Sequence, residues 1–90
     1  AVNKMVDKAC DDTIVNEMKA LVLSIDGVEG LDLIKTRMFG PKIYVDIEIS
    51  ADGELLLRES HEIAETVHDS IEKQFPDVKH CTVHVNPKGY

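Results

Sequence analysis

The chain has 90 residues, 43% hydrophobic and 30% charged, a balance typical of one small globular domain. Seventeen acidic residues against ten basic residues give a net charge of −7 at pH 7, which argues against a nucleic-acid partner because phosphates would be repelled. The longest apolar run, residues 20–23, is far shorter than the roughly 20 apolar residues that cross a bilayer, so no membrane insertion of this stretch is expected.

The first predicted element is a helix between Asp11 and Ser24, where apolar residues recur at helical spacing. Asp12 or Thr13 is the expected N-cap residue. The helix is expected to end at Gly27, because glycine readily adopts the left-handed conformation that closes a helix. Before it, residues 2–10 show little amphipathic pattern and predict either a further helical turn or a tether.

A β-hairpin is predicted next, with arms at 31–39 and 42–50 and a turn at Gly40 and Pro41. Odd positions 43–49 of the second arm are apolar, while most even positions are polar. This period of two indicates a strand with one buried face.

A second helix is predicted from Leu55 to Gln74, ended by Pro76, and a last strand covers 80–86 and stops at Pro87. The order α-β-β-α-β predicts an α+β fold, a two-layer sandwich with two helices on one face of a three-stranded sheet.

Two cysteines are too few for a disulfide framework. Cys81 alternates with outward-facing residues and is expected in the core, whereas Cys10 precedes the first helix and is either an exposed thiol or an inert loop residue.

Polar side chains gather on the sheet face that the helices would leave open. They are Tyr44, Asp46, Glu48, Thr82, His84 and Asn86. Imidazole beside carboxylates suits zinc or related divalent ions, and an open face suits a second copy of the chain. A merely hydrated face is the alternative. His61, Glu65 and His68 share one side of the second helix, a spacing that solvated helix surfaces also show.

Enzyme function is not expected. The chain has no glycine-rich phosphate loop, no GxSxG elbow and no HExxH helix. One hypothesis for this topology is a stand-alone soluble module that binds metal or small molecules. Copper delivery would call for a pair of exposed thiolates, which the spacing of the two cysteines does not provide.

A series of short segments carries a family resemblance. They are MVDKA at 5–9, GVEG at 27–30, LIKTR at 33–37, GP at 40–41, SHEIA at 60–64, FP at 75–76 and VHVNP at 83–87. In this order they resemble the cytoplasmic C-terminal domain of cation diffusion facilitator transporters. The resemblance implies a metallochaperone-like, ferredoxin-like fold and a homodimer.

The resemblance also implies a role. Residues 1–10 would be the linker from a membrane domain absent from this chain, and residues 11–90 a cytoplasmic metal-sensing dimerisation domain. Such a domain regulates a divalent cation/proton antiporter by biasing the transmembrane domain of the same polypeptide, as the cytoplasmic part of an integral membrane protein. A chain that begins at Ala1 is expected of a fragment cut from a longer protein.

The metal ligands of the family fall here on Asp32, Glu48, His61, His84 and Asn86. His61 and His84 keep the imidazole ligand, while Asp32 and Glu48 replace histidines and Asn86 replaces a carboxylate that can bridge two ions. Because an amide oxygen is a weaker ligand than a carboxylate, we expect one weaker site per protomer or a site shared across the dimer. Zinc is the first expected cation, with manganese, iron, cobalt and cadmium also compatible.

Overall fold

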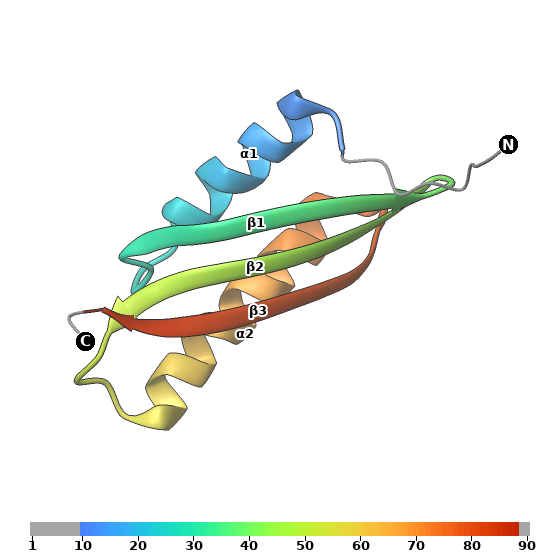
Figure 1. Ribbon diagram of the computed structural model, residues 1–90. Helices are drawn as coiled ribbons and strands as arrows, with labels where there is room; N and C mark the ends of the chain where they lie inside the picture. The colour runs from blue at the N-terminus through green and yellow to red at the C-terminus, as the bar shows by residue number, and fades with distance from the viewer. Residues whose placement is uncertain (1–9, 89–90) are drawn as a thin grey trace, which may run out of the picture.

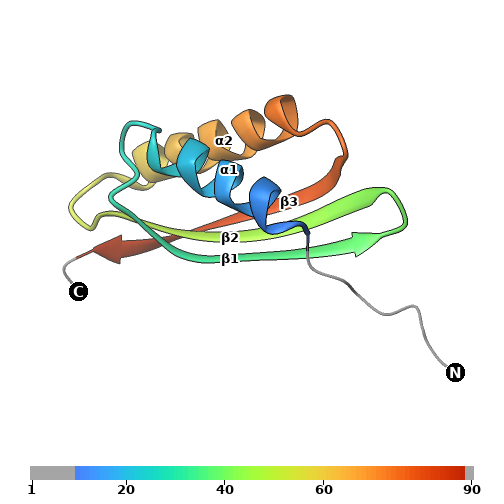
Figure 2. The ribbon, with the colours of Figure 1, turned by 90° about the horizontal axis from the view of Figure 1, so that it is seen from above.

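The fold is known from a computed structural model, which describes residues 10–88. Its elements are α1 (Asp12–Leu23), β1 (Gly30–Phe39), β2 (Lys42–Asp52), α2 (Leu57–Gln74) and β3 (Val78–Lys88). The sheet order is β1-β2-β3, with β1 antiparallel and β3 parallel to β2. Both helices cover one face of the sheet, and the other face is open (Figures 1 and 2). The predicted element order and two-layer sandwich are confirmed.

The start of α1 is fixed by a side-chain cap. The Asp11 carboxylate accepts a hydrogen bond from the Thr13 N–H at 2.8 Å, so Asp11 is the N-cap residue and the prediction of Asp12 or Thr13 is wrong. The helix ends at Leu23, before Gly27, which has φ +94° and turns the chain toward β1.

The second helix begins two residues later than predicted, at Leu57. The Glu59 carboxylate reaches back and accepts the Leu56 N–H at 2.8 Å, which satisfies a donor that has no partner within the helix.

Strand β3 extends beyond the predicted range of 80–86 at both ends. Its parallel pairing with β2 continues as far as Asp52 opposite Lys88, and Pro87 lies within it. The expectation that Pro87 ends the strand is wrong because β3 is an edge strand, where a residue without an N–H is tolerated.

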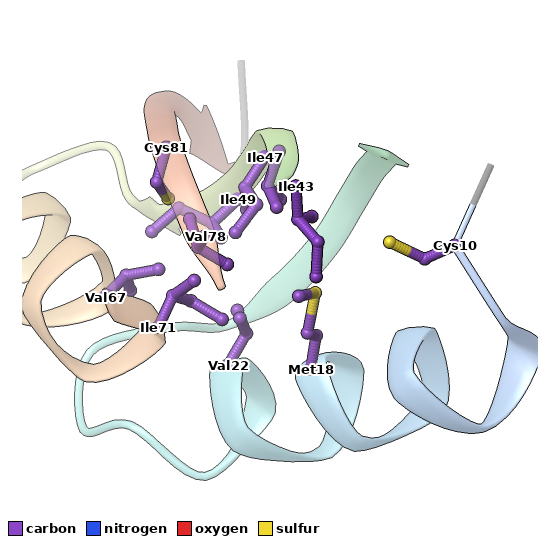
Figure 3. Close-up of a cluster of buried hydrophobic side chains, with 11 residues drawn as sticks. Cys10, Met18, Val22, Ile43, Ile47, Ile49, Val67, Ile71, Val78 and Cys81 are labelled. Atoms are coloured by element: carbon purple, nitrogen blue, oxygen red, sulfur yellow. The ribbon is translucent and has the colours of Figure 1, made fainter. Parts of the chain in front are cut away.

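Inward-facing side chains from both helices and the sheet form one core (Figure 3). Its fully buried members are Met18, Val22, Val45, Ile47, Ile49, Val67 and Ile71. Cys81 is buried, as predicted.

Cys10 is also buried, so the interpretation as an exposed thiol is wrong. Its N–H donates to the hydroxyl of the buried Thr36 at 2.9 Å, which places residue 10 within the folded domain. The rest of the predicted linker, residues 1–9, lies outside the described residues. Over residues 10–88, neither helix is long and apolar enough to span a membrane.

Candidate metal centre

The open face of the sheet carries the polar side chains that the alternation predicts. Along β2, residues with side chains toward the helices are buried, and those between them, including Asp46 and Glu48, are half-buried on the open side. The parallel register sets Glu48 opposite His84 and Asp46 opposite Thr82. This face is turned toward the viewer in Figure 1.

Three of the five predicted ligands meet on this face. The register between β1 and β2 shifts between Leu31 and Leu33, so Asp32 occupies a bulge at the edge of the sheet. The Asn86 Nδ2 donates to Asp32 Oδ2 at 2.9 Å and to Glu48 Oε1 at 3.2 Å. Each strand therefore contributes one member of what we call the Asp32–Glu48–Asn86 cluster.

His84 belongs to the same region of the open face. It lies directly opposite Glu48 in the register, two positions before Asn86, and its side chain is exposed. Since residues i and i+2 of a strand point to the same face, its imidazole is available beside the cluster.

His61 lies elsewhere. Its Nε2 is 3.4 Å from Glu65 Oε2 on α2, and both side chains line a groove between α2 and β3 with Ala64, His68 and Val83. Val83 faces this groove, and its neighbour His84 faces the opposite side. The two predicted histidines are thus separated by β3 within one protomer.

His68, the other histidine of α2, has two carboxylate neighbours. His68 Nδ1 is 3.1 Å from Asp69 Oδ1, and its Nε2 is 3.2 Å from Glu72 Oε2. Its neighbours approach opposite sides of the ring, so this group does not enclose a common point.

Asp46 is also engaged, by partners that sequence patterning did not identify. It lies 3.6 Å from Arg37 and accepts the Thr82 hydroxyl at 2.7 Å. Beyond it, Tyr44 packs edge-on against Phe39, with ring centroids 4.8 Å apart. This end of the open face is therefore internally paired and contributes no free carboxylate.

Both cysteines are buried. Burial raises the pKa of the Cys81 thiol to about 12, with the negative charges of Glu72 and Asp46 contributing further. Across the described residues 10–88, no three His, Cys, Asp or Glu side chains converge as a complete ligand set. What one protomer offers is a pair of carboxylates held by an amide, with an imidazole beside them.

Comparison with known proteins identifies the domain. A profile of the family described as "Cation efflux protein, cytoplasmic domain" matches residues 10–88. The chain belongs to this family of cation diffusion facilitator domains. The resemblance inferred from the sequence is confirmed.

Two relatives show how much of a longer protein this chain spans. The manganese efflux system protein MneP of Bacillus subtilis is 32% identical over 87 residues, which are 97% of this chain and 29% of MneP. Metal tolerance protein 2 of Oryza sativa subsp. japonica is 31% identical over 85 residues, 94% of this chain and 22% of that protein. The chain thus spans less than a third of the length of either relative.

Solved structures support the fold. The MamM CTD, a fragment covered to 98%, aligns with 86% of this chain at a TM-score of 0.82 and 22% identity. A nickel form of a MamM CTD variant aligns with 87% of this chain at a TM-score of 0.83 and 22% identity. The metallochaperone-like, ferredoxin-like fold is therefore confirmed.

Proposed function

We propose that this domain is the cytoplasmic regulatory part of a divalent cation/proton antiporter and binds divalent cations on its open sheet face. The observation that carries the proposal is the convergence of the Asp32 and Glu48 carboxylates on one group of hydrogen-bond donors. Two carboxylates held around a positive partial charge, with an imidazole beside them, supply the oxygen and nitrogen ligands that bind such cations. The residues present therefore fit a divalent ion.

We further propose that the domain works as a homodimer and that the cation favours its closed form. Within the described residues of one protomer no complete ligand set converges. His61 with Glu65 lies on the other side of β3, where it would complete a site only together with a second protomer. Carboxylates that repel one another across such an interface are neutralised by a cation, so binding and association reinforce each other.

In the full transporter, closure of the two domains would bias the transmembrane domain of the same polypeptide, with the segment before Cys10 as linker. The MneP name specifies manganese, and forms of the MamM CTD contain nickel or cadmium, which supports a divalent cation as ligand. Zinc, manganese, iron, cobalt and cadmium remain the ions to compare, and the domain itself would bind and regulate without catalysing a reaction.

Calorimetric titration with these cations tests the proposal. We expect Glu48→Gln to weaken binding about tenfold or more, since loss even of a residue that only supports a ligand costs about 10–100-fold. Glu17→Gln is the matched control, because Glu17 is exposed on α1 and takes no part in the open face. Equal affinities for Glu48→Gln and the unmodified domain, or no binding of any cation, would contradict the proposed function.

A further inference from the structure

The Asn86 side chain contacts two carboxylates, the kind of partners that a cation would have. Its Nδ2 group donates one hydrogen bond to Asp32 Oδ2 at 2.9 Å and another to Glu48 Oε1 at 3.2 Å. An amide NH₂ has two donors, so both are used on carboxylates. The nitrogen therefore stands where a positive charge shared by the two acids would stand.

Without these donors the cluster would be unfavourable. Two carboxylates held close together repel, and each is stabilised when a donor points at it. Glu48 and Asn86 are half-buried, so solvent screens their interaction only in part. The bonds also tie the bulge of β1 to β3 across the whole sheet, between residues 54 positions apart.

We propose that the Asn86 carboxamide is an internal substitute for the cation: it holds Asp32 and Glu48 together in the metal-free domain and must release them when a cation binds. This inference rests on the proposed function for its metal-bound state. Release is a rotation of the amide that turns Nδ2 away from the carboxylates and presents Oδ1 in its place. Asn86 thereby preorganises the site and at the same time limits its affinity.

The same residues determine the class of cation. After the amide rotates, the cluster offers oxygen atoms from Asp32, Glu48 and Asn86, and only His84 lies beside it with a nitrogen. Carboxylate and carbonyl oxygens suit manganese, whereas imidazole suits zinc. The expectation of zinc depends on His61 and His84 acting together, and β3 separates them within a protomer. We therefore infer a site biased toward manganese relative to a histidine-based site in the same fold.

We call this holding of Asp32 and Glu48 by Asn86 the clamp. Thermal melting of the metal-free domain tests the clamp without any cation. Asn86→Asp removes both donors and adds a third carboxylate, and we expect its melting temperature to fall by about 5 °C or more. Asn16→Asp is the matched control, because it adds the same charge at an exposed position of α1 and should melt as the unmodified domain does. Equal melting temperatures for Asn86→Asp and Asn16→Asp would overturn the clamp.

A second variant covers the case in which Asn86→Asp does not fold. Asn86→Ala removes the donors without adding charge. The difference in melting temperature between this variant and the unmodified domain should be smaller in high salt, because salt screens the repulsion between Asp32 and Glu48. A loss that salt leaves unchanged would mean that Asn86 contributes packing only, and would overturn the proposal.

Cation titrations test whether a cation takes the place of the Asn86 amide. Titration of Asn86→Asp with Mn²⁺ should show an affinity at least tenfold above that of the unmodified domain, because a charged ligand replaces a competing donor; an unchanged or lower affinity overturns the idea. In Glu48→His the ratio of the Mn²⁺ to the Zn²⁺ dissociation constant should rise at least tenfold, and a constant ratio would refute the manganese bias. If no variant binds any cation, the proposed function fails, while the metal-free melting curves still decide the clamp.

Discussion

Gly27, in the connection from α1 to β1, lies against the Ile63 side chain of α2. It has φ +94°, and a Cβ added there would lie 2.6 Å from Cδ1 and 2.9 Å from Cγ1 of Ile63. For Gly27→Ala the backbone conformation costs about 1–2 kcal/mol. The crowding against Ile63 costs about 1–3 kcal/mol more, because the Ile63 side chain must shift. We expect a loss of about 2–5 kcal/mol in the free energy of unfolding.

Gly40→Ala provides the matched control. Gly40 also has positive φ, at +59°, but an added Cβ would meet nothing within 4 Å. Its substitution should therefore cost only the backbone contribution, about 1–2 kcal/mol. Both variants share the small stabilisation that alanine gives by restricting the unfolded chain, so their difference isolates the contact with Ile63.

Thermal unfolding followed by circular dichroism measures both variants. In a domain of this size each 1 kcal/mol shifts the melting temperature by about 4–8 °C. Gly27→Ala should therefore melt about 8–40 °C below the unmodified protein and Gly40→Ala about 4–16 °C below it. Equal shifts for the two variants would refute the close packing of the Gly27 connection on α2, the helix that carries His61.

Three further outcomes are expected. Asp11→Ala should lower the free energy of unfolding by about 1 kcal/mol in urea titrations, with an unchanged m value, because only the cap on the Thr13 N–H is lost. The pKa of Cys81 is raised from 9.0 to about 12 in the folded state, so thiol reagents should label native protein slowly at pH 8, and stability should fall as pH rises from about 9 to 12; fast native labelling would argue against its burial. His84→Ala and His61→Ala should each weaken cation binding about tenfold in calorimetry while the melting temperature stays the same, since both side chains are exposed.

The five elements could be predicted because their signals are local. Alternation in 42–50 fixes which side chains of β2 are buried, since a shift of one residue would expose the whole apolar set. Helical spacing in α1 and α2 likewise identifies the side that packs on the sheet. The same alternation places Glu48 and His84 on the open face and Cys81 in the core, as the structure has them.

The contacts within the candidate site could not be predicted in this way. The bulge at Asp32 has no local sequence signal, and the bond from Asn86 to Asp32 joins positions 54 apart. Periodicity gives the helix side on which His61 lies but not how that side is turned relative to β3, so its separation from His84 depends on tertiary packing. Cys10 is buried through a non-local bond to Thr36, which the preceding polar segment does not indicate.

The central claim, a dimer that a divalent cation closes, is tested most directly by light scattering at micromolar concentration. One chain has a mass of 10.0 kDa. With Mn²⁺ or Zn²⁺ present, the account predicts a weight-average mass of twice that value, and addition of a chelator should shift the protein toward the monomer or toward a more open dimer with a larger hydrodynamic radius. A mass of 10.0 kDa both with and without the cation would contradict the account.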